Sequence, residues 1–486
     1  MEAMLNDAIS TINGYLWSYF IIFILIGAGL FFTMTTNFVQ IRMIKEMIRL
    51  VINGAGSSTE KNHVSSFQAF CVSTASRVGV GNIAGIAIAV VLGGPGAIFW
   101  MWVIALIGAA TGFIESTLAQ IYKEPVAKGG FYGGPAYYIR YGLNNKALSV
   151  LFAILISITY GWIYNSVQAN TLAASLQVFN FDVSYTGAVV AILLGLIIFG
   201  GISRVAKASE IIVPIMAVLY IATALFVVIM NITQFPHVIY TIISSAFEPV
   251  AAGGGLLGAT VMNGIKRGLF SNEAGEGSVP NAAATAAVNH PVEQGLVQAF
   301  GVFLDTFIIC TASAFIVLMV GDYSTTGLTG VALVQHNLEQ QLGSWAPTAV
   351  AIFIVMFSFS SLIGNYYYGE INISHLTEKR FYLHLFRIGV IIMTFVGSIA
   401  SLDLVWNLAD LFMAFLVLTN ISSIVRMGRT AGLALDDYIK QRKAGIETPV
   451  FNRSVLNHTY GIVWWGDGQT TDSSVPPTPV EDTMEK

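Results

Sequence analysis

A polar, glycine-rich segment interrupts one of the long apolar stretches of the chain. Residues 73–85 read STASRVGVGNIAG, and each glycine lowers helix propensity by about 1 kcal/mol relative to alanine. Backbone N–H groups freed at such a break can hold a carboxylate, and freed carbonyl groups suit a cation such as sodium. The segment therefore predicts a binding site built from backbone and hydroxyl groups.

Three serines, Ser358, Ser360 and Ser361, lie in the middle of another apolar stretch at 344–370. Their hydroxyl oxygens can complete a sodium shell that the freed carbonyl groups begin. In the alternative interpretation, each hydroxyl bonds to a carbonyl group of the preceding helical turn. Beside the interrupted segment at 73–85, the sequence favours the sodium site.

Two ionisable residues lie about halfway through apolar stretches. A charged side chain at the bilayer centre costs roughly 2.5–3.5 kcal/mol on insertion scales. Arg77 and Asp305 fall at similar depth, so we predict that they are paired or close. Two roles stay open. Arg77 and Asp305 form a buried ion pair that joins two parts of the protein, or Asp305 senses or binds a cation whose movement drives the function of the protein. Glu115, Glu210 and Asp410 lie nearer the ends of their stretches, where solvent or interfacial partners suffice.

The composition indicates which environment surrounds these apolar stretches. Charged residues make up 10% of the 486 residues and hydrophobic residues 55%, against about 25% charged in an average soluble domain. The chain is therefore an integral membrane protein, and its 23 basic and 27 acidic residues offer no surface for nucleic acid. Cys71 and Cys310 form no disulfide or zinc pattern. We expect no cofactor and, without a nucleotide-binding motif, no ATP hydrolysis.

About eleven stretches are long enough to cross a bilayer, which needs about 20 apolar residues per helix. They lie near residues 15–36, 68–93, 95–121, 147–173, 185–201, 208–231, 250–268, 294–320, 344–370, 381–400 and 403–425. The first has no basic region before it and no cleavage site after it, so we expect a retained span.

Basic residues mark one side of these spans. Lys and Arg follow spans 1, 3, 5 and 9 and recur in the C-terminal region, whereas the connections after spans 2, 4, 6, 8 and 10 contain none. We interpret Lys266 and Arg267 as the cytoplasmic end of span 7. Because Lys and Arg collect in cytoplasmic loops, the sequence predicts an external N-terminus and a cytoplasmic C-terminus. The amphipathic segment 38–52 then lies along the inner leaflet.

Spans 2 and 7 are both rich in glycine, and span 7 reads GGGLLGATVMNGIKRG at 253–268. Two interrupted spans five helices apart are typical of an inverted-repeat secondary transporter. We predict an all-α bundle whose repeats are spans 2–6 (68–231) and spans 7–11 (250–425), with span 1 as an extra helix. The alternative is that the glycines only permit close helix packing. Residues 1–465 then form one transmembrane domain, and residues 466–486 a disordered cytoplasmic tail.

Several motifs closely resemble the alanine-or-glycine:cation symporter family. They are TASRVGVGNIAG at 74–85, GGPGAIFWMW at 93–102, GGPAYYI at 133–139, GIKRGLFSNEAGEGS at 264–278, FLDTFIICTASA at 303–314 and YYYGE at 366–370. That family is similar in fold to the bacterial leucine transporter and to the amino acid–polyamine–organocation superfamily. The resemblance implies eleven helices, alternating access and sodium-coupled uptake of a small neutral amino acid.

The resemblance also implies two sets of ligands. For sodium they are the carbonyl groups of Ala75, Val78 and Phe357 with the hydroxyl groups of Ser360 and Ser361. The residues implied for the amino acid come from spans 2, 4, 7 and 9 and are Ser76, Gly79, Val80, Gly81, Gln168, Thr260, Met262, Ser361 and Asn365. Many family members have tryptophan in place of Asn365. The smaller, more polar Asn365 makes glutamine an alternative to alanine and glycine.

The sequence thus predicts a symporter of the plasma membrane that imports a small neutral amino acid with sodium. Proton coupling is the close alternative, although a neutral site of hydroxyl and carbonyl groups favours sodium. An intramembrane enzyme would need more convergent acids or histidines than Asp305 and Arg77 provide. A channel would need a symmetric filter or a run of gating charges, and the sequence has neither.

Overall fold

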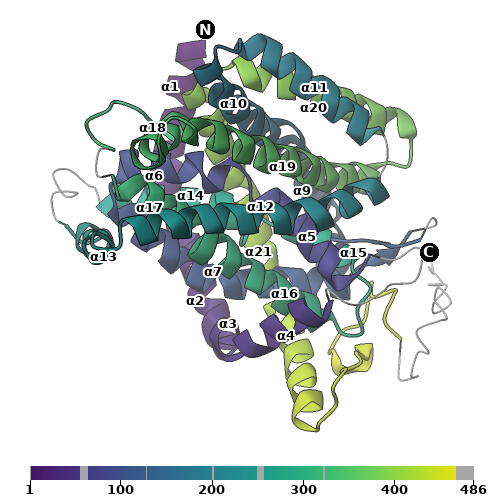
Figure 1. The fold of residues 1–486 in the computed structure, drawn as a ribbon. Helices are drawn as coiled ribbons and strands as arrows, with labels where there is room; N and C mark the ends of the chain where they lie inside the picture. Colours follow the sequence, from purple (N-terminus) through teal and green to yellow (C-terminus); the bar gives the residue numbers. More distant parts are fainter. Residues whose placement is uncertain are drawn as a thin grey trace.

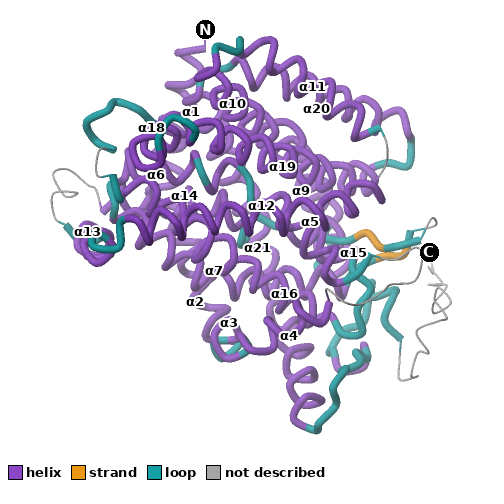
Figure 2. Tube along the Cα trace, in the orientation of Figure 1, coloured by secondary structure: helices purple, strands orange, loops and turns teal. Residues whose placement is uncertain are grey.

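The chain folds into a bundle of helices with one short β-hairpin (Figure 1; Figure 2). The computed structural model describes residues 2–54, 64–126, 129–199, 202–248, 257–320 and 323–466, with the side chains of 202–210 and 257 left out of the description. Most of the predicted tail at 466–486 therefore lies outside the described residues. An all-α multi-pass membrane protein is confirmed.

Most helices begin and end close to the predicted spans, but the first helical run begins at Glu2 instead of near 15, and the last ends at Lys443 instead of near 425. The first half contains α1 (Glu2–Leu16), η1 (Trp17–Ile21), α2 (Ile22–Thr35), α3 (Val39–Arg42), α4 (Ile44–Gly54), α5 (Ser66–Arg77), η2 (Val80–Asn82), α6 (Ala84–Gly93), α7 (Gly96–Ile121), β1 (Glu124–Pro125), β2 (Phe131–Tyr132), α8 (Pro135–Gly142), α9 (Lys146–Ile158), η3 (Thr159–Tyr164), α10 (Asn165–Leu176), η4 (Gln177–Phe179), α11 (Val183–Ile198) and α12 (Ile202–Met230). The second half contains α13 (Phe235–Ser245), α14 (Leu257–Asn272), α15 (Val279–Thr285), α16 (Pro291–Phe303), η6 (Leu304–Cys310), α17 (Thr311–Leu318), α18 (Gly330–Leu342), α19 (Ala346–Leu376), α20 (Arg380–Ile399), α21 (Leu402–Lys443) and η7 (Arg453–Val455).

Eight helical runs in the described part are long and apolar enough to cross a membrane, and they coincide with predicted spans 1, 3, 4, 6, 8, 9, 10 and 11. The other three predicted spans are helical but shorter or interrupted: α5 with α6, α11, and α14 with α15. The arrangement as two repeats of five helices stays a prediction.

The two ends of the bundle are defined by contacts of the chain termini. The backbone N–H of Ser401 donates to the Glu2 carboxylate at 3.0 Å, and we call this end the N-side. At the other end, the C-side, the Trp465 indole donates to the Gln120 carbonyl at 2.9 Å. The amphipathic segment predicted at 38–52 is helical as α3 and α4, which lie at the C-side (Figure 1).

The interruption predicted in span 2 is confirmed. Helix α5 begins with a capping box in which the Ser65 hydroxyl and Gln68 backbone N–H bond, and it ends at Arg77. Gly79 is extended, η2 forms a single tight turn, and α6 begins at Ala84. Polar backbone groups are therefore free of the regular helical pattern at this point of the span.

The interruption in span 7 lies further along the chain than the sequence predicted. Helix α14 runs unbroken to Asn272, and the break is at 273–278, before α15. Backbone angles explain its place, because Glu273, Gly275 and Gly277 have φ of 58°, 98° and 79°, a left-handed conformation that ends a right-handed helix. The predicted segment 250–268 overlaps α14, which ends four residues later at Asn272, and Gly253–Gly255 lie outside the described residues.

Lys266 and Arg267 do not mark the end of a span. Both are buried in α14, where the carboxylate of Asp410 pairs with the Lys266 ammonium at 3.3 Å and with the Arg267 guanidinium. Trp17 and Trp406 place their rings over the two cations, at 5.3 and 4.4 Å. Compensation by one carboxylate and two rings is what allows these charges to lie inside the bundle. Asp410 is likewise buried, although the sequence placed it near an interface.

Replacing Asp410 by asparagine should destabilise the protein strongly. Asp410→Asn leaves two buried cations without their counter-charge, and breaking a buried ion pair in this way costs about 3–5 kcal/mol. Thermal unfolding in detergent or nanodiscs measures the effect as a lowered Tm. Asp403→Asn is the matched control, because Asp403 is exposed at the start of the same helix. An equal Tm for both variants would contradict the compensation argument.

Candidate functional site

The interrupted backbone of span 2 contacts two polar side chains from other helices. Ser361, in α19, donates to the Ala75 carbonyl at 3.0 Å. The amide oxygen of Gln168, in α10, accepts from the backbone N–H of Val80 at 3.0 Å. A Cβ on Gly79 would lie 2.8 Å from the Gln168 amide nitrogen and closer still to the Ser361 hydroxyl. Glycine is therefore required where the helices α5, α10 and α19 converge.

Asp305 connects the interruptions of the two spans. Asn82 accepts from the Gly79 N–H at 2.9 Å and donates through its amide nitrogen to one Asp305 oxygen at 2.6 Å. The other Asp305 oxygen accepts from the Ser271 hydroxyl at 2.7 Å, one residue before the end of α14. The carboxyl group thus holds the break in span 2 against the end of α14.

Arg77 does not form the direct ion pair with Asp305 that was one of the two predicted arrangements. Among the described residues, its guanidinium donates to the Gln298 carbonyl at 3.2 Å, and no ion pair joins it to Asp305. The guanidinium also packs against Gly301, where a Cβ would clash with it.

The break in span 7 brings two glutamates into the centre of the bundle. Glu273 accepts from the Ser76 hydroxyl at 2.8 Å and from the Ser278 hydroxyl at 2.5 Å. Glu276 accepts from the hydroxyls of Tyr160 and Tyr164, in η3, at 2.7 and 3.1 Å. Both carboxyl groups are buried. The break in span 7 is thereby attached to α5 and to η3.

A third buried carboxyl group, that of Glu115 in α7, supports the same break. It accepts from the Gly275 N–H at 3.1 Å and from the Asn420 side chain at 2.7 Å. The sequence placed Glu115 near an interface and did not single out Glu273 or Glu276. The available signal was the pair of acidic residues among glycines in SNEAGEGS, which was noted only as a family motif.

Ser76 and Asn365 lie together beside these groups. The Ser76 hydroxyl oxygen lies 2.8 Å from the Asn365 amide oxygen and equally far from Glu273. Asn365 is buried in the middle of α19, one turn after Ser361. The structure thus collects Ala75, Ser76, Gly79, Val80, Gln168, Ser361 and Asn365 into one region.

An aromatic cluster covers this region toward the N-side. A Cβ on Gly81 would lie 2.7 Å from the ring of Phe270, in α14. The Phe270 ring packs on Tyr164 and Trp406, with centroids 4.6 and 4.8 Å apart. Phe270 therefore contacts the unwound segment at the position where the sequence placed Thr260 and Met262.

Thr260 and Met262 lie elsewhere on the same helix. They precede Phe270 by ten and eight residues in α14, which is about 12–15 Å along a helix axis. The Met262 sulfur contacts the Ser18 hydroxyl at 4.0 Å, in the first span. The structure does not bring these two residues to the interrupted backbone.

The predicted sodium ligands are only partly assembled. Ser361 meets Ala75, and Val78 is the C-cap of α5. Ser360 instead donates to the Phe357 carbonyl at 2.9 Å, within α19. That bond is the alternative that the sequence left open for the serines, and it keeps Ser360 and Phe357 one turn apart on one helix face.

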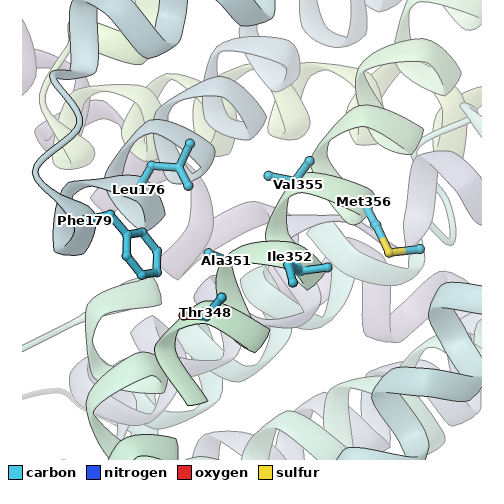
Figure 3. A pocket seen from close by; sticks show the side chains of 7 residues that line it. All are labelled: Leu176, Phe179, Thr348, Ala351, Ile352, Val355 and Met356. Atoms are coloured by element: carbon cyan, nitrogen blue, oxygen red, sulfur yellow. The ribbon is translucent and has the colours of Figure 1, made fainter. Parts of the chain in front are cut away.

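A hollow of about 320 Å³ between α10, η4 and α19 is separate from this region (Figure 3). Its lining is apolar except for Thr348, and the labelled side chains come from the end of α10, from η4 and from the first third of α19. None of its lining residues belongs to an interrupted helix. The interrupted backbone, and not this hollow, is the candidate functional site.

Two broken transmembrane helices whose backbone is met by serine, glutamine and asparagine side chains are typical of a secondary transporter. The chain belongs to the sodium:alanine symporter family, whose model matches residues 1–453. Three relatives extend this finding. The chain is similar to the probable sodium/glutamine symporter GlnT of Bacillus subtilis strain 168, with 50% identity over 96% of this chain and 97% of the relative.

The amino-acid carrier protein AlsT of the same organism is 48% identical over 96% of this chain and 99% of the relative. The sodium/alanine symporter AgcS of Methanococcus maripaludis is 39% identical over 86% of this chain and 93% of the relative. A solved structure of Mhp1, a nucleobase-cation-symport-1 family transporter in a closed conformation, has 14% identity and a TM-score of 0.48, and covers 79% of this chain and 80% of that chain.

Gly79→Ala should disrupt the region, because the added Cβ has no room between Gln168 and Ser361. Overpacking of this kind costs about 1–3 kcal/mol, so we expect a lowered Tm and loss of any stabilisation by sodium and amino acid. Gly27→Ala is the control, since a Cβ on Gly27 meets open space within α2. Thermal unfolding with and without both ligands is the measurement. Unchanged ligand stabilisation in Gly79→Ala would contradict this description of the site.

Proposed function

We propose that the protein is a sodium-coupled symporter that imports a small neutral amino acid, alanine or glycine, by alternating access. The observation that supports this most directly is the convergence of Ser361 and Gln168 on the unwound backbone around Gly79. We further propose that the C-side faces the cytoplasm. The family supports a cation and an amino acid as the two transported species.

The amino acid would lie against the backbone between Ser76 and Gly81. Its carboxylate is suited to the N–H groups at the start of η2 and α6, where the helix dipole is positive. Its ammonium group would face the Glu273 carboxyl group, which already contacts Ser76. Phe270 and Trp406 would exclude water from the N-side of the bound molecule.

Sodium would lie between α5 and α19, with Ala75, Val78 and Phe357 supplying carbonyl oxygens. The hydroxyl groups of Ser360 and Ser361 would complete the shell, as their oxygen lone pairs remain available when each donates its proton to a carbonyl group. Because α5 and α19 both contact the unwound segment, sodium would hold that segment in the shape that binds the amino acid. Coupling then follows if each ligand binds one conformation better than the other.

Alternating access requires a closed layer on each side of the site. Toward the N-side, Phe270, Trp406 and the Arg267–Asp410 pair form such a layer. On the opposite side, toward the C-side, hydrogen bonds from Tyr160 to Glu276 and from Ser76 to Glu273 hold the interruption of span 7 in place. Opening the N-side would break the contacts of α14. Opening the other side would break the contacts of the 273–278 interruption, and in each case the contacts on the opposite side remain.

Glutamine is a second candidate substrate, supported by Asn365. The amide nitrogen of Asn365 is buried without a hydrogen-bond partner among the described residues. The amide oxygen of a glutamine side chain could accept a hydrogen bond from it, whereas the methyl side chain of alanine has no acceptor. The relative at 50% identity is named a probable sodium/glutamine symporter, which supports the same choice.

Uptake into proteoliposomes tests the proposed function. Purified protein is reconstituted, and labelled alanine, glycine and glutamine are supplied with a sodium gradient or a proton gradient imposed separately. We expect accumulation driven by the sodium gradient and none by a proton gradient in sodium-free buffer. Accumulation under the second condition would overturn sodium coupling.

Asn365→Trp should narrow the site and change its selectivity. The indole fills the space that a glutamine side chain would occupy and removes an amide partner, so glutamine uptake should fall about 100-fold relative to alanine uptake. Competition between the two labelled substrates in the same vesicles measures the ratio, and alanine uptake serves as the internal control. An unchanged ratio would show that Asn365 does not face the substrate.

A further inference from the structure

Lys123 is a fully buried lysine that none of the proposed ligand sites uses. It follows α7 at the C-side, and its side chain is 0% exposed. Burial lowers the pKa of the Lys123 ammonium well below its usual range. Among the described residues it forms no ion pair. A buried cation of this kind persists only where other contacts compensate it.

The first compensating contact is with α15, the C-side half of interrupted span 7. The Lys123 ammonium donates to the Ala286 carbonyl at 2.8 Å, at the C-cap of α15. A cation at this end of a helix interacts favourably with the helix dipole. The Gln120 side chain adds bonds to the carbonyl groups of Ala283 and Ala286, at 2.5 and 3.0 Å.

The end of α15 at Ala286 also contacts the segment just before α5, which is the C-side half of interrupted span 2. Val64, two residues before α5, forms a parallel β-bridge with Ala286. The Ala287 N–H donates to the Val64 carbonyl at 3.0 Å. The C-side ends of the two interrupted helices are therefore joined to each other and, through Lys123, to α7.

A third set of contacts comes from residues 451–466, which we call the C-terminal strap. The Lys123 ammonium lies 4.1 Å from the ring centroid of Phe131 and 5.1 and 6.0 Å from those of Trp465 and Trp464. Trp464 packs on Phe131 at 4.5 Å, and the Trp465 indole donates to the Gln120 carbonyl. These rings both stabilise the ammonium by cation–π interaction and separate it from water.

The strap is also attached beyond the end of α15. The Phe451 N–H donates to the Asn289 carbonyl at 3.0 Å, and its ring packs on His290 and Trp465 at 5.1 and 5.3 Å. The strap thus spans from the chain after α15 to the end of α7. Its two tryptophans lie near the Lys123 ammonium, which among the described residues reaches the end of α15 by one hydrogen bond, to the Ala286 carbonyl.

We propose that Lys123 is a positioning residue for transport and that the C-terminal strap holds the C-side of the site closed through it. The unwound backbone of the site directly follows α5 and directly precedes α15. Separating the C-side ends of these helices would open the site to that side. This inference rests on the proposed alternating access, and it makes release of the strap a step in the exit of the substrate.

The first test measures access to α15 without requiring transport. Ala282, buried in α15, is replaced by cysteine, and labelling by an impermeant maleimide is followed in inside-out vesicles with the chain lacking this cysteine as background. Trp464→Ala with Trp465→Ala, and separately Lys123→Met, should speed labelling about tenfold, as expected for loss of cation–π contacts and a hydrogen bond. Trp345→Ala is the matched control, because Trp345 is 58% exposed at the N-side, whereas Trp465 is 7% exposed.

The outcomes separate positioning from simple stabilisation. If the strap positions α15, the double variant raises the KM for uptake from the N-side about tenfold, because fewer molecules face that side, while kcat per folded molecule is retained. Loss of folded protein alone would leave KM unchanged. Labelling at the unaltered rate in folded variants would overturn the inference, whether or not sodium drives uptake.

Trp465→Phe keeps the test decisive if the double variant fails to fold. It preserves an aromatic face for Lys123 and removes only the indole donor to Gln120. We expect a labelling rate between that of the protein with the unaltered strap and that of the double variant. Amide hydrogen exchange of residues 279–287, measured on the same variant without the added cysteine, should rise in parallel. No rise in either measurement would contradict the role of the strap.

Discussion

The structure depends on one constraint: polar backbone groups inside a bilayer must find partners within the protein. Two membrane-spanning helices are interrupted, at residues 78–83 and at residues 273–278, so their backbone groups there lack regular helical partners. Each break is satisfied by side chains, with Gln168 from α10 and the local Asn82 on the first and Glu115 from α7 on the second. The backbone at the first of these breaks is also where we propose that the amino acid and sodium bind, so the proposed site depends on the contacts that stabilise the fold.

Buried charge follows a second rule that refines the first. The sequence assigned most basic residues to one side of the membrane, which left Lys266 and Arg267 as an apparent span end. In the structure, Asp410 compensates both cations inside the bundle. Lys123 shows the other solution, in which carbonyl groups and aromatic rings replace a carboxylate. Charge inside this protein therefore lies at joints between helices, where it fixes how one helix meets another.

The sequence predicted what is local and missed what is assembled over long distances. Glycines and polar residues at 73–85 were enough to place the break in span 2, and apolar length was enough to place most helices. The break in span 7 was misplaced because the glycines at 253–264 were more conspicuous than the left-handed turn that begins at Glu273. Phe270 and Glu276 could not be assigned, because their partners Gly81, Tyr160 and Tyr164 lie about 110 to 190 residues away along the chain.

In the proposed site, the two interruptions together bind the amino acid with sodium. A cryo-electron microscopy map of the protein in nanodiscs with sodium and glutamine or alanine tests it most directly. We expect density for the amino acid between the backbone of 78–83 and the 273–278 break, in contact with Gln168, and an ion between Ala75 and Ser361. Amino-acid density away from both breaks, or a continuous helix through 78–83 in the bound state, would contradict it.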